Sequence, residues 1–89
     1  MADETLRTWG ENIKLRREVL NTHGDLRGPE DEPMSQGRLG ELLDPPVTQA
    51  TVSRWEAGLI EPRRRYKAQL ASVLHTDVRV LFPMVRTAA

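Results

Sequence analysis

Apolar residues recur at helical spacing in five stretches of this chain, with polar residues between them. Such spacing predicts five helices that each bury one face. The first helix is expected over residues 3–22. Four apolar residues share its inner face: Leu6, Trp9, Ile13 and Leu20. No stretch alternates between apolar and polar positions as a half-buried strand does, so the pattern predicts an all-α fold.

Two short helices are predicted in the middle of the chain, over residues 35–43 and 48–57. Ser35 and Thr48 are suited to cap their N-termini, because a side-chain hydroxyl accepts a hydrogen bond from a free backbone N–H of the first turn. Residues 44–46, Asp-Pro-Pro, are expected to end the helix over residues 35–43, since proline cannot donate a backbone hydrogen bond and disfavours helical geometry just before it. The core-facing residues are expected to be Leu39, Leu42, Leu43, Val52 and Trp55.

The remaining two helices are predicted after Gly58, a residue type that commonly follows the last turn of a helix. Pro62 is expected to open the fourth helix, because a first-turn proline is tolerated. Thr76 or Asp77 can cap a short fifth helix that ends before Pro83. The inner faces of these two helices are expected to contain Tyr66, Leu70, Val73, Leu74, Val78, Leu81 and Phe82. The whole pattern predicts a compact five-helix bundle.

The 89 residues are the size of one domain, so residues 1–89 are expected to fold as a single unit. Residues 24–34 hold two glycines, two prolines and four acidic residues, which predicts an exposed acidic loop. Residues 84–89 carry no helical pattern and are expected to form a tail. The chain lacks cysteine, which excludes disulfides, thiolate metal ligands and a cysteine nucleophile.

Neither end of the chain suggests export or insertion into a membrane. The N-terminus, Met1-Ala2-Asp3-Glu4, is acidic and lacks the basic and then apolar pattern of a signal peptide. No apolar run is long enough to span a bilayer. We therefore expect a cytoplasmic protein without a membrane partner.

Charge is unevenly distributed along the chain, although it sums to zero. Residues 1–34 carry five basic and eight acidic residues, a net charge of −3, whereas residues 47–75 carry five basic and two acidic residues, a net charge of +3. Neutralisation of a nucleic-acid backbone by Lys and Arg is local, so a basic segment within a neutral protein can still bind phosphate.

The basic segment begins with the third predicted helix, which follows the second after a short connector. Two short helices joined in this way are typical of a helix-turn-helix, here over residues 35–58. In that motif the N-terminal part of the second helix contacts base edges in the major groove. The chemistry requires short polar side chains at the start of that helix. This chain has Thr48, Gln49, Thr51, Ser53 and Arg54 there.

Several stretches together resemble one known family. They are Ser35-Gln36, Leu39, the run Val47-Thr48-Gln49-Ala50-Thr51-Val52-Ser53-Arg54-Trp55-Glu56-Ala57-Gly58, Glu61-Pro62, Leu70-Ala71-x-x-Leu74 and Val80-Leu81-Phe82-Pro83. Over residues 9–83 the chain resembles the Cro/repressor-type (XRE-like) helix-turn-helix family of phage and bacterial regulators. The resemblance implies a five-helix, lambda-repressor-like domain that binds double-stranded operator DNA, usually as a dimer on a two-fold site.

The resemblance implies base contacts from the third helix, by Thr48, Gln49, Ala50, Thr51, Ser53 and Arg54. A bidentate bond from Gln49 to adenine, or from Arg54 to guanine, is worth roughly 1–3 kcal/mol of discrimination between bases. Ala50 can offer an apolar contact to a thymine methyl group. The alternative for these residues is ordinary polarity on a helix surface, with Arg54 in a solvent-exposed ion pair.

The resemblance also implies contacts to DNA phosphates, by Ser35, Gln36, Arg38, Arg63, Arg64 and Arg65. Ser35 can instead be a helix cap alone. The three consecutive arginines lie at the predicted start of the fourth helix, where cations are unfavourable unless an anion is near, because the N-terminal end of the helix dipole is positive. The alternative is a solvated helix N-terminus. Arg17 and Glu56 are expected to form a structural ion pair between the first and third helices.

Two departures from the family affect the motif. The acidic loop before Ser35 is longer than usual, and residues 44–47 replace a shorter turn that contains glycine. Both can shift the second helix relative to the third. The expected phosphate contact of Gln36, on the second helix, is therefore more sensitive to these departures than the expected base contact of Gln49.

Other functions remain to be weighed. His23 and His75 are isolated and lack the spacing of a metal pair, so we expect no enzyme, metal, cofactor or small-molecule ligand. The acidic loop with Met34 keeps open a protein-interaction module, such as an antitoxin or co-regulator. The fifth helix and tail suggest a homodimer seam, formed by Val78, Val80, Leu81, Phe82, Met84 and Val85. The alternative is that these residues close the core of a monomer.

Overall fold

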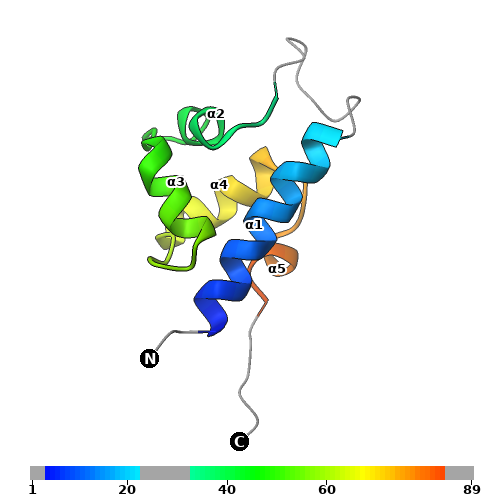
Figure 1. Cartoon of the computed structure of the whole chain (residues 1–89), viewed down its shortest axis with the longest axis vertical. Helices are drawn as coiled ribbons and strands as arrows, with labels where there is room; N and C mark the ends of the chain where they lie inside the picture. Colours follow the sequence, from blue (N-terminus) through cyan, green and yellow to red (C-terminus); the bar gives the residue numbers. More distant parts are fainter. Residues whose placement is uncertain (1–3, 23–32, 84–89) are drawn as a thin grey trace, which may run out of the picture.

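Five helices make up the described part of the chain, residues 4–22 and 33–83 of this computed structural model. Their bounds are α1 Glu4–Thr22, α2 Gln36–Glu41, α3 Gln49–Glu56, α4 Arg64–Val73 and α5 Val78–Leu81. No strand occurs in these residues, so the predicted all-α class is confirmed. In Figure 1, α1 lies across the molecule, with α2 and α3 on one side and α4 behind them. None of these helices is long and apolar enough to cross a bilayer.

The core collects side chains from all five helices. Its buried members are Ile13, Leu20, Leu39, Leu43, Val52, Trp55, Tyr66, Leu70, Ala71, Leu74, Leu81 and Phe82. Full burial of one large apolar side chain stabilises the fold by about 1.5–3 kcal/mol. Two residues expected in the core are instead exposed, Leu42 to 39% and Val78 to 38%. Both Leu42 and Leu43 follow the last residue of α2, Glu41, and of the two only Leu43 is buried in the core.

Hydroxyl caps begin α2 and α3 as predicted. Ser35 Oγ accepts a hydrogen bond from Arg38 N at 3.0 Å, and Thr48 Oγ1 accepts one from Thr51 N at 3.3 Å. Both helices are shorter than expected. The capping residues have extended backbone and precede the first helical residue, and α2 ends two residues before Leu43. Gly58 follows α3 with a φ of 74°, a left-handed conformation that glycine adopts without strain.

The prediction that Pro62 opens α4 is wrong. Pro62 is fully buried, and the backbone stays extended through Arg63, so that α4 begins at Arg64. At the other end of α4, His75 adopts a φ of 55°, a left-handed conformation. Of the two caps predicted for α5, Asp77 is the one used, since its carboxylate accepts a hydrogen bond from Arg79 N at 2.7 Å.

Two glycines allow close approach of backbone to backbone. A Cβ atom on Gly10 would lie 2.4 Å from Trp55 O, so α1 packs directly on the C-terminal end of α3. A Cβ atom on Gly40 would lie 2.3 Å from Val47 O, where α2 meets the connector to α3. A glycine inside a helix costs about 1 kcal/mol relative to alanine because its backbone loses more conformational entropy on folding. At these two positions the close backbone contact requires glycine despite that cost.

Two residues of the predicted dimer seam, Leu81 and Phe82, close the core, which was the alternative interpretation of the sequence. Both are buried, and Phe82 packs edge-on against Trp9 with ring centroids 5.5 Å apart. Of the seam residues that the structure describes, only Val78 and Val80 are exposed. Residues 84–89, with Met84 and Val85, lie outside the described residues, as do residues 24–32 of the predicted acidic loop.

Candidate nucleic-acid interface

α3 separates its side chains cleanly into an inner and an outer face. Val52, Trp55 and Glu56 are buried, while the outer residues are exposed: Thr48, Gln49, Ala50, Ser53 and Arg54. The side chains of Gln49, Ser53 and Arg54 make no hydrogen bond or ion pair with any other described residue. The outer face of α3 therefore presents amide, hydroxyl and guanidinium groups that a ligand can bind without breaking an internal contact.

Two threonines at the start of α3 already have structural partners. The Thr48 hydroxyl caps the helix and lies 3.2 Å from the hydroxyl of Thr51, which is half-buried. This contact stabilises the first turn of α3. It also orients both hydroxyl groups beside Gln49.

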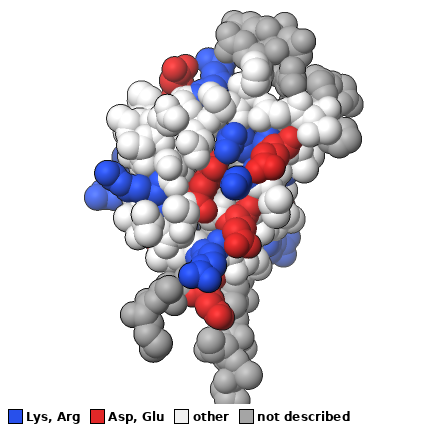
Figure 2. Space-filling model, in the orientation of Figure 1, with Lys and Arg blue, Asp and Glu red and all other residues white. Residues whose placement is uncertain are grey.

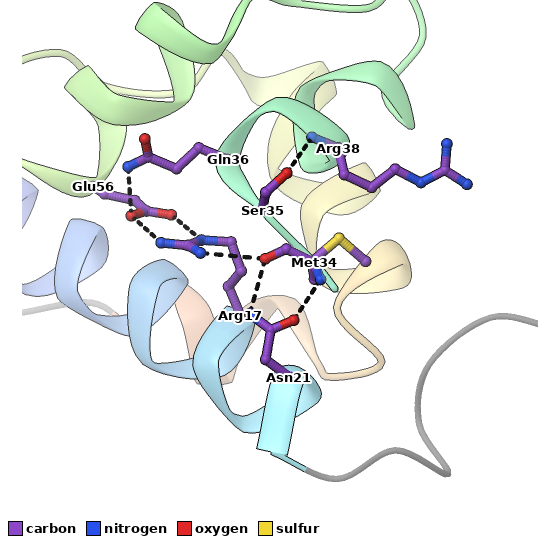
Figure 3. Close-up of polar contacts among 7 residues, drawn as sticks. All are labelled: Arg17, Asn21, Met34, Ser35, Gln36, Arg38 and Glu56. Atoms are coloured by element: carbon purple, nitrogen blue, oxygen red, sulfur yellow. Dashed lines mark hydrogen bonds and ion pairs between the residues drawn. The ribbon is translucent and has the colours of Figure 1, made fainter. Parts of the chain in front are cut away.

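A buried ion pair joins the first and third helices, the pair that the resemblance implies. Arg17 Nε lies 2.7 Å from Glu56 Oε2, and Arg17 Nη2 lies 3.0 Å from Glu56 Oε1 (Figure 3). The Arg17 side chain is 14% exposed and that of Glu56 only 4%. The hydrogen bond to Glu56 raises the pKa of Arg17 above its ordinary value. It fixes the C-terminal end of α3 against α1.

Gln36, the first residue of α2, extends this pair into a network. Its Nε2 donates a hydrogen bond to Glu56 Oε1 at 3.0 Å, so its amide faces inward (Figure 3). The second N–H of that amide makes no bond within residues 4–22 or 33–83. One carboxylate thus connects α1, α2 and α3, and within the described residues the Gln36 amide retains one N–H without a partner.

The chain that enters α2 is tied to α1. Arg17 Nη1 and Asn21 Nδ2 donate hydrogen bonds to Met34 O at 3.2 and 3.1 Å, and Met34 N donates one to Asn21 Oδ1 (Figure 3). Met34 is half-buried and also packs against the core. Asn21 has no sequence pattern that marks this role.

The predicted phosphate-binding arginines fall into two groups. Arg63, Arg64 and Arg65 are exposed at the N-terminus of α4, which has no side-chain cap. Arg38 on α2 is half-buried and lies 3.6 Å from Glu41, which is exposed. The first group is therefore more accessible to an anion than Arg38 is.

Two lysines differ in their availability to a ligand. Lys67 Nζ lies 2.7 Å from Glu61 Oε2 and 4.3 Å from the ring centroid of Trp9, so its charge is used within the fold. Lys14 on α1 is exposed and lines a hollow of about 220 Å³ together with Gln36 and Ser53. The place of Lys14 beside Gln36 and Ser53 could not be predicted, because nothing in the helical pattern distinguishes Lys14 from a solvated residue.

Charge is distributed unevenly over the face of the molecule that Figure 2 shows. Acidic and basic side chains lie close together along α1 in this view (Figure 2). On the outer face of α3, Arg54 is the only charged residue among those exposed in the described structure. No cluster of three or more His, Cys, Asp or Glu residues in the described segments could hold a metal ion.

Comparison with known proteins adds no relative. No protein-family model, no curated protein and no solved structure matches this chain. The resemblance to the Cro/repressor family therefore stands on the residues of the chain alone.

Proposed function

We propose that this protein is a sequence-specific DNA-binding regulator of transcription, in which α2 and α3 act as a helix-turn-helix on operator DNA. The observation that carries the proposal is the division of α3 into two faces. Val52, Trp55 and Glu56 form its buried face. Gln49, Ser53 and Arg54 are exposed on the outer face, and their side chains make no hydrogen bond or ion pair with another described residue. A helix that enters the major groove needs this division.

In this proposal α3 supplies the sequence specificity. The Gln49 amide can bond the N6 and N7 atoms of adenine, and the Arg54 guanidinium can bond O6 and N7 of guanine. Ala50 lies exposed between them in sequence and can contact a thymine methyl group. Each bidentate bond contributes roughly 1–3 kcal/mol to the choice of base.

Phosphate contacts would supply most of the affinity. The candidates precede and follow α3 in the chain. Ser35 caps α2, Gln36 and Arg38 lie in α2, and Arg63, Arg64 and Arg65 lie at the start of α4. Lys14 beside Gln36 adds one further cation. An arginine cluster at the positive end of a helix dipole is relieved by an anion, which supports a phosphate partner there. Binding would then weaken steeply as salt rises.

A second candidate is a protein-interaction module, such as an antitoxin or co-regulator. Leu59 and Ile60, which follow α3, are 71% and 40% exposed, and exposed apolar residues favour a protein partner. Against it, the outer face of α3 carries only Ala50 as an apolar residue, whereas a docking helix needs larger anchors.

Selection from a random pool of DNA duplexes tests the proposal. We expect one motif to emerge, and its symmetry reports whether the protein binds as a monomer or a dimer. On the selected duplex, Gln49→Ala and Arg54→Ala should each weaken binding by roughly 1–3 kcal/mol. Arg79→Ala, which removes an exposed guanidinium from α5, is the matched control and should change affinity little.

Salt provides the second part of the test. Affinity for the selected duplex should fall by orders of magnitude between about 50 and 200 mM salt if several phosphates are neutralised. Absence of any motif, together with weak binding that ignores both α3 substitutions, would refute the DNA-binding proposal and favour the protein-interaction module.

A further inference from the structure

The connector between α2 and α3 is attached to α4 by three hydrogen bonds. Asp44 N donates to Gln69 Oε1 at 2.7 Å, and Gln69 Nε2 donates back to Asp44 O at 2.8 Å. Tyr66 Oη donates to Pro45 O at 2.8 Å. We call these four residues, Asp44, Pro45, Tyr66 and Gln69, the connector clamp.

The clamp binds backbone groups of a connector that has few donors of its own. Pro45 and Pro46 have no backbone N–H, so they cannot donate hydrogen bonds to carbonyl groups nearby. Val47 N donates to Gly40 O at 3.0 Å, which ties the end of the connector to α2. The link to α4 consists of side-chain bonds to the backbone, and the Gln69 amide satisfies both the donor and the acceptor of Asp44.

The two ends of α3 are therefore held by different devices. Its C-terminal end is fixed to α1 by the Arg17–Glu56 pair and by the close approach of Gly10. Its N-terminal end begins at the cap Thr48, three residues after Pro45, so the connector places the first turn of α3, before Val52 enters the core. Gln49 stands at that end. A hydrogen bond weakens steeply once its angle or length departs from the optimum, so small shifts of this end would matter to base contacts.

We infer that Gln69, together with the Tyr66 hydroxyl, positions the N-terminal end of α3 and so sets the base specificity of the protein without touching DNA. This inference rests on the proposed DNA-binding function. The clamp bonds neutral groups only. It should therefore affect the fit of α3 to bases and leave the sequence-independent attraction to phosphates unchanged.

The test compares two duplexes of equal length, the selected site and a scrambled sequence. Gln69→Met keeps much of the side-chain volume and removes both bonds to Asp44, while Tyr66→Phe keeps the core ring and removes the bond to Pro45. Each variant should bind the selected duplex about three- to tenfold more weakly, the effect expected for one or two hydrogen bonds. Binding to the scrambled duplex should change by less than about twofold. Ser72→Ala, an exposed position on α4, is the control.

A purely structural role predicts a different result. Partial unfolding removes binding-competent molecules regardless of DNA sequence, so it would lower both affinities by one common factor. A second readout is the loss of affinity for the selected duplex that Gln49→Ala causes. This loss should be smaller in the Gln69→Met background than in the wild type, because a displaced Gln49 already makes a weaker base contact.

Equal losses on both duplexes, or no loss on either, would overturn the inference while the proposed function stands. A wild-type protein that selects no site overturns the proposed function and this inference with it. The two failures are therefore distinguishable in one set of measurements.

Discussion

The buried face and the outer face of α3 differ in their contacts with the rest of the fold. On the buried face, Val52 is fully buried in the core and Glu56 pairs with Arg17. On the outer face, Gln49 and Ser53 are exposed, and their side chains make no hydrogen bond or ion pair with another described residue. One helix thus combines a face that is anchored in the fold with a face that is open to a ligand.

This difference separates stability from function between the two faces of one helix. Substitutions that disturb the buried face should mainly change the free energy of unfolding. Substitutions on the outer face should leave stability almost unchanged and alter DNA binding instead. Four sets of variants, from the largest expected loss of stability to the smallest, test that separation.

Breaking the Arg17–Glu56 pair should have the largest effect. Glu56→Ala leaves the half-buried Arg17 guanidinium without its carboxylate, which should destabilise the fold by about 3 kcal/mol, the low end of the cost of breaking a buried ion pair. Denaturant unfolding followed by circular dichroism measures the loss. Replacing both partners, with Arg17→Met and Glu56→Leu together, should restore part of it, and a double variant less stable than the single one would contradict this account.

Gly10→Ala should be the next most damaging. The new methyl group would lie 2.4 Å from Trp55 O and 2.5 Å from Glu56 O, so α1 must move away from α3, at a cost of about 2–3 kcal/mol. Gly37→Ala in α2 is the matched control, because its methyl group would meet only Ser35 Oγ at 3.9 Å. That variant should gain up to about 1 kcal/mol from helix propensity. The same melting temperature for both variants would show that the close approach is unimportant.

Removal of the α3 cap should have a moderate effect. Thr48→Ala loses the hydroxyl that accepts from Thr51 N, and this should cost about 1 kcal/mol of unfolding free energy. Thr48→Ser keeps an acceptor at the same place and should be nearly as stable as the wild type. If serine and alanine are equally destabilising, the hydroxyl does not stabilise this end of the helix.

Substitutions on the outer surface should have the smallest effect on stability. Gln49→Ala and Ser53→Ala remove side chains without internal partners, so each should change the free energy of unfolding by less than about 0.5 kcal/mol. Thermal unfolding of both variants beside the wild type measures this. A large loss of stability would mean that the outer face contributes to the fold and is not reserved for a ligand.

Local chemistry accounts for what the sequence predicted well. Hydroxyl caps and a terminal glycine act within one turn of chain, so Ser35, Thr48 and Gly58 mark helix ends in the sequence as they do in the structure. Helical spacing likewise identified most core residues, because burial of one face follows the period of the helix. The division of α3 into two faces follows from the same period.

Tertiary contacts account for what the sequence missed. Leu42 has the spacing of a core residue but is exposed, and Pro62 is drawn into the core before α4 begins. Gln69 is an ordinary polar residue in the sequence and becomes informative only when α4 lies beside the connector. Such roles depend on which elements pack together, and no local pattern encodes that.

A cycle that changes both protein and DNA tests the central claim most directly. It measures the cost of Gln49→Ala on the selected duplex and again on duplexes with each base pair of the site replaced in turn. We predict a coupling of roughly 1–3 kcal/mol between Gln49 and a single A·T pair, with the cost of Gln49→Ala vanishing once that pair is replaced. A cost that is the same on every duplex, or absent on all of them, would contradict the claim that α3 contacts bases.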